Sequence, residues 1–157
     1  MNREYFILGL TSAIDLGIPL ADMGSVIQFE TSSICTVPGV ASFWCGVINF
    51  KGSLLWVLDC NPFFNLEIPP RTSSRLTAVI LQNQQSGNQN RVALVAQKLK
   101  GIVSVESSRL LPLTDNVSAQ LRDCCSAITQ IEGQEIYIID SAASLQRLQQ
   151  QSSLVSV

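Results

Sequence analysis

Histidine is absent from this chain of 157 residues. Imidazole titrates close to neutral pH, so it is the usual general base, metal ligand and proton carrier of proteins. Its absence excludes nucleophilic catalysis of the Ser-His-Asp and Cys-His types. The glycine-rich phosphate-binding motifs G-x-G-x-x-G and G-x-x-x-x-G-K-[ST] are also missing, and the twelve acidic residues are scattered. We therefore expect no catalytic residue, no cofactor and no metal site, and predict that the protein is not an enzyme.

Charge is scarce as well, because charged residues make up only 14% of the chain and the net charge is −2. The ten Lys and Arg residues never occur side by side, so no basic cluster is available to bind nucleic acid. No apolar run reaches the roughly 18 residues of a membrane span, and the N-terminus lacks the features of a signal peptide. We expect no nucleic-acid partner, no direct membrane insertion and a cytoplasmic location. A weakly charged surface favours contacts with other proteins.

Cysteine is present in an odd number, five, and without a C-x-x-C motif. Two of the five, Cys124 and Cys125, are adjacent, which rarely permits a disulfide. The spacing indicates neither a disulfide framework nor a zinc site. We predict that all five stay reduced and behave as small hydrophobic side chains.

Short runs of aliphatic and β-branched residues alternate with turn residues along the whole chain, and hydrophobic residues make up 46%. About ten short strands favour paired small barrels, with a β-sandwich joined by Greek-key links as the alternative. Outside the central motif, we predict strands at residues 5–10, 14–20, 24–29, 76–82, 91–96, 101–106, 127–131 and 135–139.

Several residues mark where these elements begin and end. Pro19 would remove a ladder hydrogen bond, which predicts an edge position or a kink. Pro69-Pro70 indicates a break between two halves of the chain. Gly133 suits a tight turn, and Asp140 or Ser141 can cap a final helix that runs to Gln150.

The most informative motif lies in the first half of the chain. The run Ile34-Cys35-Thr36-Val37-Pro38-Gly39-Val40 reads as one strand with a turn, and Gly46-Val47-Ile48-Asn49-Phe50-Lys51-Gly52-Ser53-Leu54-Leu55-Trp56-Val57-Leu58-Asp59 reads as two strands joined at Lys51-Gly52. This pattern resembles the signature of CheW-like domains, the small adaptors of bacterial chemotaxis. Trp56 stands where that family usually has proline.

The resemblance implies an all-β fold with a short C-terminal helix, in which two small five-stranded SH3-like β-barrels surround a shared core. We expect a single domain over residues 1–157. Lobe 1 would cover about residues 14–66 and lobe 2 about residues 75–140, with the N-terminal strand and the C-terminal helix packing across them.

The resemblance also implies a function. It is that of a non-catalytic signal-transduction adaptor, which couples methyl-accepting chemoreceptors to a CheA-type histidine kinase in taxis or motility. The alternative is a free-standing CheW-like protein that acts in pilus-based twitching motility, or that modulates a signalling array by competition.

The resemblance further implies partner-binding residues. Lys51 matches the family's cation near the kinase and receptor surfaces, and Asn49 is expected to bond the local backbone. The family often pairs this cation with a glutamate, whose place Ser25 takes here. Asp22 or Glu30 is the candidate substitute partner for Lys51.

We also expect an apolar groove between the lobes, which would receive an α-helical hairpin of a receptor. Its predicted lining is Leu20, Met23 and Ile27 on one side and Val103 or Val105 on the other. The strand Ser25–Phe29 is predicted at a sheet edge that offers unpaired backbone groups to a partner. Trp56 is assigned to the core, whereas Phe43 and Trp44 are predicted in a surface loop as a contact pair.

Overall fold

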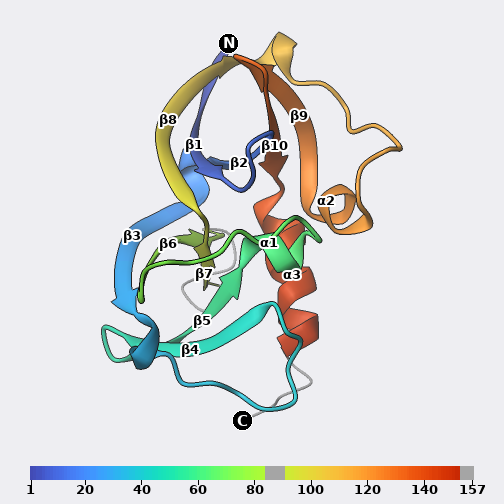
Figure 1. Cartoon of the computed structure of the whole chain (residues 1–157). Helices are drawn as coiled ribbons and strands as arrows, with labels where there is room; N and C mark the ends of the chain where they lie inside the picture. The colour runs from blue at the N-terminus through green and yellow to red at the C-terminus, as the bar shows by residue number, and fades with distance from the viewer. Residues whose placement is uncertain (84–90, 153–157) are drawn as a thin grey trace.

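The described part of the chain, in a computed structural model, covers residues 1–83 and 91–152, the last three through their backbone only. It forms ten β-strands in two curled five-stranded sheets, which we call lobe A and lobe B (Figure 1). Lobe A has the strand order β8-β1-β2-β10-β9, and lobe B has the order β3-β6-β7-β5-β4. This all-β architecture confirms the predicted pair of five-stranded barrels.

Lobe A contains β1 (Asn2–Gly9), β2 (Ile14–Pro19), β8 (Lys98–Glu106), β9 (Cys125–Ile131) and β10 (Gln134–Ile139). Lobe B contains β3 (Met23–Glu30), β4 (Trp44–Phe50), β5 (Ser53–Asp59), β6 (Arg75–Gln82) and β7 (Arg91–Val95).

The two lobes have the same strand plan. The strands that occupy equivalent places in the two sheets are five apart in the numbering. Thus β1 and β2 of lobe A correspond to β6 and β7 of lobe B, while β8, β9 and β10 correspond to β3, β4 and β5. The directions match too, because β2 and β10 pair in parallel as β5 and β7 do, while the remaining pairs of both sheets are antiparallel. The chain is thus two consecutive five-stranded units, each of which has given its first two strands to the sheet of the other.

This exchange corrects the predicted division of the strands. Residues 14–66 do not form one lobe and residues 75–140 the other, since β2 lies in lobe A while β6 and β7 lie in lobe B. The break at Pro69-Pro70 separates the two sequence units and not the two sheets. The N-terminal strand β1 is an inner strand of lobe A, hydrogen-bonded to β2 and β8.

Pro19 ends β2, and the short 3₁₀ helix η1 (Leu20–Asp22) then carries the chain from lobe A into lobe B. The predicted edge position is wrong, because β2 pairs with both β1 and β10. Asp15, Leu16 and Ile18 of this strand are all buried. Strand β2 lies between β1 and β10 at the centre of its sheet, which accounts for burial on both faces.

The central motif forms one hairpin and not three strands. Strands β4 and β5 pair across Lys51-Gly52 as predicted. The preceding run contributes a single bridge, from Cys35 to Val47, and then an exposed turn around Gly39. An equivalent bridge joins Leu111 to Ile128 in lobe A.

Helices are few among the described residues. They are α1 (Cys60–Phe63), α2 (Ala119–Cys124) and α3 (Ser141–Ser152), with the 3₁₀ helices η2 (Thr31–Ser33) and η4 (Ser107–Arg109) besides η1. Asp140 caps α3 as predicted, since its Oδ1 accepts a hydrogen bond from Ala143 N at 3.1 Å. None of these helices is long and apolar enough to cross a membrane.

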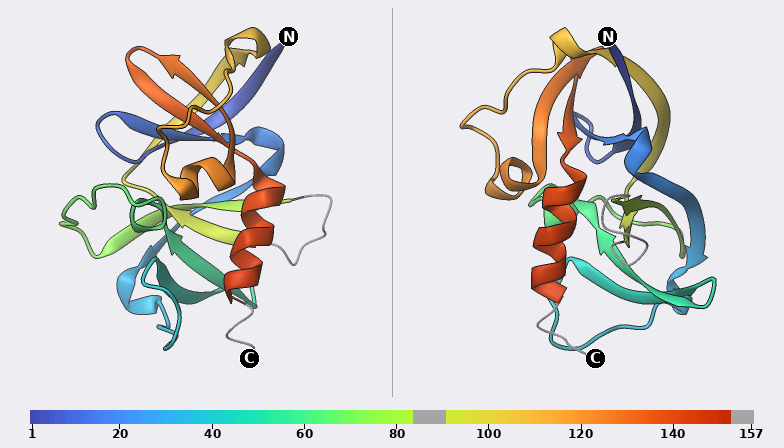
Figure 2. Two further views of the ribbon diagram at one scale, coloured as in Figure 1. Left: turned by 90° about the vertical axis from the view of Figure 1, so that its right-hand side faces the viewer. Right: turned by 180° about the vertical axis from the view of Figure 1, so that it is seen from behind.

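Helix α3 leaves lobe A and runs along lobe B (Figures 1 and 2). Leu145 and Leu148 are buried in the core cluster that both lobes share, together with Leu8 and Leu16 of lobe A and Leu58 of lobe B. Polar contacts fix the helix along its length, because Ser141 Oγ donates to Asp22 Oδ2 at 2.8 Å and Arg147 pairs with Asp123 at 3.2 Å. The C-terminal helix therefore ties the lobes together.

Candidate partner-binding surfaces

Lys51 lies at the tip of the β4–β5 hairpin, where the backbone itself fixes its place. Two residues form the turn, and both have positive φ, 52° at Lys51 and 83° at Gly52. A two-residue turn with positive φ at both positions is the type I′ geometry that matches strand twist. Asn49 Oδ1 accepts a hydrogen bond from Gly52 N at 3.0 Å, which agrees with the local role expected of Asn49. The turn therefore presents the Lys51 side chain on a rigid support.

The surroundings of Lys51 are cationic and aromatic. Its Nζ lies 5.2 Å from the centre of the Phe50 ring, and the guanidinium of Arg91 lies 5.8 Å from the same ring. Within the described residues, the salt bridges present do not include Lys51. A positive charge is thus exposed at this end of lobe B, and no carboxylate of the described residues forms a salt bridge with it.

Neither acidic residue suggested as a partner for Lys51 is engaged with it. Asp22 accepts a hydrogen bond from Ser141, and Glu30 Oε2 accepts one from Ser74 Oγ at 3.1 Å. Among the described residues, neither of them supplies the ion pair that was expected for Lys51. Ser25, which was expected to take the place of a glutamate, is exposed on β3.

Strand β3 is an edge strand of lobe B, as predicted, because it pairs only with β6 in the described sheet. Ser25, Val26 and Gln28 on this strand are exposed, and Val26 has 44% of its surface accessible. An edge with free backbone groups and an exposed aliphatic side chain can accept an added strand or a flat partner surface.

The five residues predicted to line one apolar groove are not brought together. Met23 packs against the shared core cluster, Ile27 against the core of lobe B, and Val103 and Val105 belong to the core of lobe A. The physical reason is strand alternation, which points Ile27 and Val103 inward and leaves their neighbours Val26 and Ile102 outside. These residues therefore do not line a common groove between the lobes.

Leu20 has a different setting from the other four. It lines an opening of about 510 Å³ in lobe A, where Tyr5, Leu110, Ile138 and Ile139 supply apolar walls. This opening lies at the start of the crossover from β2 to β3. It is a candidate apolar contact surface that contains one of the predicted residues.

Sequence reasoning missed several exposed apolar residues. Leu54 has 70% of its surface accessible, Ile102 has 57%, and Val26 was not singled out. The signal was available in the alternation of β3 and β8, since assigning Ile27 and Val103 to the core leaves Val26 and Ile102 facing solvent. Leu54 follows the Lys51 turn and adds apolar area to that exposed tip.

The aromatic residues of the central motif are mainly structural. Trp44 is 7% exposed, and its ring lies 5.1 Å from that of Trp56 in an edge-on arrangement. Phe43 packs against Phe63 at 4.9 Å between ring centres. Trp56 packs against the core, as assigned, whereas the expected surface contact pair of Phe43 and Trp44 is wrong, since Trp44 begins β4 and is buried.

No grouping of three or more acidic or cysteine side chains suited to a metal ion occurs among the described residues. The cysteines there are free thiols, of which Cys35 alone is exposed. Burial raises the pKa of the Cys45 thiol to about 11 and also raises the pKa values of Cys60, Cys124 and Cys125. Their inertness remains a prediction, and thiol labelling of the native protein tests it.

Comparison with known proteins gives one family and one fold. The family model described as CheW-like domain matches residues 6–149. The scaffolding protein TtCheW from Thermoanaerobacter tengcongensis has a similar structure, with a TM-score of 0.73 at 17% sequence identity, over 89% of this chain and 90% of that chain. No curated protein sequence matches.

Proposed function

Because the chain belongs to the CheW-like domain family, we propose that it is a non-catalytic adaptor which couples methyl-accepting chemoreceptors to a CheA-type histidine kinase. The observation that carries the proposal is the exposed, rigidly held Lys51. The motif around it matches it to the cation that the resemblance expects to face partners, and it forms no salt bridge within the described residues. A cation that no intramolecular partner neutralises is free to steer an acidic surface.

Two surfaces of lobe B would share the work of binding. The hairpin tip offers Lys51 and Leu54, supported by Asn49, while the β3 edge offers Ser25 and Val26. The apolar opening beside Leu20 in lobe A is a third candidate contact. Met23, Ile27, Val103 and Val105 would support these surfaces from below through packing.

The test is calorimetric titration of the whole chain with a receptor cytoplasmic fragment and with the kinase regulatory domain. Lys51→Glu and Val26→Glu are expected to weaken binding to one or both partners while melting temperatures stay near wild type. Ile102→Glu is the matched control for Val26→Glu, because it places the same charge at the equivalent position of lobe A. A wild-type chain that binds neither partner would refute the proposal.

The same titrations test the alternative of an array modulator. A competitor would bind the kinase domain yet lower kinase activity when added to a working assembly of receptor, kinase and adaptor. An adaptor would instead restore activity to an assembly that lacks one. Action in pilus-based motility would appear as binding to the receptor and kinase of that system and not to their swimming counterparts.

A further inference from the structure

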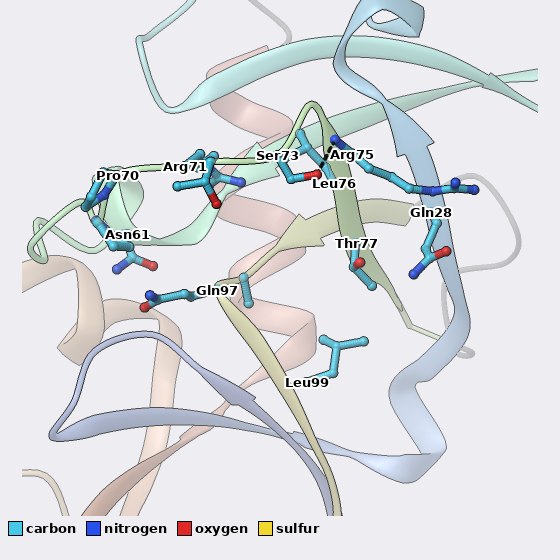
Figure 3. Close-up of a pocket in the computed structure, with 13 residues that line it drawn as sticks. Gln28, Asn61, Pro70, Arg71, Ser73, Arg75, Leu76, Thr77, Gln97 and Leu99 are labelled. Carbon is cyan, nitrogen blue, oxygen red and sulfur yellow. Dashed lines mark hydrogen bonds between the residues drawn. The ribbon is translucent and has the colours of Figure 1, made fainter.

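The junction between the lobes contains a second cavity, of about 500 Å³, away from the Lys51 tip. One wall is the segment before β6, which includes Arg71 and Ser73, and the floor is formed by β6 itself. Gln28 of β3 closes one side, and Gln97 and Leu99, at the crossover from β7 to β8, close the other. Figure 3 shows these side chains around one open space.

The charge of the lining is one-sided. Two arginines, Arg71 and Arg75, contribute to it, and no acidic residue does, although the chain as a whole carries a net charge of −2. Neutral donors complete the lining, namely the amides of Gln28 and Gln97 and the hydroxyl of Thr77. Asn61 also borders the cavity, but its amide nitrogen already donates to Leu10 O and Glu67 O.

Arg71 is held in place by Asp59, whose Oδ1 lies 2.8 Å from Arg71 Nη2. Burial raises the pKa of the Asp59 carboxyl, and the neighbouring guanidinium opposes that shift. A guanidinium has five N–H donors in a planar fork, so one ion pair leaves further donors of Arg71 unused. The ion pair therefore orients this arginine at the rim and does not exhaust it.

Arg75 has a different setting. Arg75 lies opposite Glu30 in the register of β6 and β3. The Glu30 carboxylate accepts a hydrogen bond from Ser74 and forms none of the salt bridges found in the described residues. In Figure 3 the Arg75 side chain extends beside Gln28 at the edge of the cavity. A second guanidinium is thus available at the mouth, close to neutral amide donors.

We propose that this cavity binds carboxylate groups, two at a time, with Arg75 and Arg71 as the charged donors and Gln28, Gln97 and Thr77 as neutral ones. Arginine and carboxylate form paired, charge-assisted hydrogen bonds, and the cavity has room for a molecule with two carboxylates. The carboxylates come either from a free small dicarboxylate or from two neighbouring acidic side chains of a partner protein. This site is separate from the adaptor function and stands or falls independently of it.

The experiment is a titration of isotope-labelled whole chain followed by nuclear magnetic resonance, which detects weak binding. The probes are succinate and the peptide acetyl-Glu-Gly-Glu-amide, each beside its uncharged counterpart, succinamide and acetyl-Gln-Gly-Gln-amide. We expect saturable shifts of the amide signals of residues 71–77 and 97–99 with the charged probes only. Saturation by succinate identifies a free dicarboxylate as sufficient, and saturation by the peptide alone identifies an acidic protein segment.

Variants locate the charge that matters. Arg75→Gln is expected to weaken the charged probe by about fivefold or more, the scale of losing a partly exposed charged hydrogen bond. Arg122→Gln removes one positive charge from the exposed face of α2, outside the cavity lining, and should leave the affinity unchanged. Equal weakening by both variants, equal binding of the uncharged probes, or shifts that never saturate would each overturn the proposal. None of these outcomes bears on receptor or kinase binding.

Discussion

The two lobes share a strand plan and differ in what they place at equivalent positions. Each has a hairpin with a two-residue turn of positive φ, made by Lys51-Gly52 in lobe B and by Glu132-Gly133 in lobe A. The same backbone geometry thus presents a cation in one lobe and a carboxylate in the other. The fold of the hairpin does not determine the charge of its turn residue. The two hairpin tips can therefore favour partners of opposite charge although their backbones have the same shape.

A second difference lies inside the lobes. In lobe A, Asp15 is buried, and its Oδ1 lies 3.0 Å from Lys100 Nζ and accepts a hydrogen bond from Gln134 Nε2 at 3.2 Å. The strand of lobe B that corresponds to β2 is β7, which begins with Arg91 over the Phe50 ring. At this position lobe A has a buried carboxylate, Asp15, in an ion pair, whereas lobe B has the cation Arg91 against an aromatic ring.

The largest expected effect concerns Gly46, which follows an irregularity in the β4–β5 register and has a φ of 137°. An added Cβ would overlap the carbonyl oxygen of Cys35 and come within 2.8 Å of Ile34 Cγ2. We expect Gly46→Ala to destabilise the protein by roughly 3 kcal/mol or more, since backbone must move and the conformation is strained. Ala127, at the corresponding place in β9, is the control, and Ala127→Gly should cost about 1 kcal/mol. Similar melting temperatures for the two variants would contradict this.

The next effect tests how the lobes are joined. The Asn61 side chain is 3% exposed and donates to Leu10 O at 2.6 Å, in lobe A, and to Glu67 O at 2.7 Å. Asn61→Ala should lower the free energy of unfolding by about 2 kcal/mol, because it leaves a buried carbonyl without its donor. Asn116→Ala changes an exposed loop residue and should have little effect in the same urea titration. An unchanged midpoint for Asn61→Ala would show that this contact does not hold the lobes.

A smaller effect is expected from the ion pair of lobe A. Lys100→Met leaves the buried Asp15 carboxylate with Gln134 as its remaining side-chain partner. The Lys100 side chain is 37% exposed, so solvent screening limits the loss to about 1 kcal/mol. Lys98→Met, two residues earlier on the same strand and exposed, is the matched control. The melting temperature of Lys100→Met should be lower than that of Lys98→Met. Equal melting temperatures would show that the ion pair does not stabilise lobe A.

The smallest effect on stability is expected from exchanging the charges of the two hairpin tips. Lys51→Glu and Glu132→Lys alter exposed side chains, and neither should change the melting temperature appreciably. Lys51→Glu should weaken kinase or receptor binding by about 1 kcal/mol, the scale of a charge at the rim of an interface. Glu132→Lys should leave the same binding intact. Equal losses for both would mean that overall charge, and not the tip of lobe B, governs the interaction.

Local chemistry made much of the fold predictable. The turns at Lys51-Gly52 and Gly133, and the cap of α3 at Asp140, follow from neighbouring residues, and all three are present. The exchange of strands does not, because the parallel pairing of β2 with β10 joins residues more than a hundred positions apart, such as Leu16 and Tyr137. The hydrophobic periodicity of a short segment identifies it as a strand, but it does not specify which distant strand will pair with it.

The candidate surfaces followed the same pattern. Lys51 and Asn49 could be identified because the motif around them is local. The groove residues Ile27 and Val103 were assigned to the outside because alternation gives two faces without saying which is buried. The carboxylate cavity was not foreseen, since Gln28, Arg75 and Gln97 come together only through the tertiary fold.

The exchange of strands between the two units also has a consequence for how the protein is made. When a ribosome has produced β1 to β5, neither lobe can close, because β3 still lacks β6 and β1 still lacks β8. Synthesis adds roughly 5–20 residues per second, so the nascent chain holds unpaired strand edges for several seconds. Pairing at such sequence separation is slow, and exposed edges are prone to aggregation. Lobe A completes its sheet only when β10 has emerged, so the risk of aggregation lasts for most of the synthesis of the second unit.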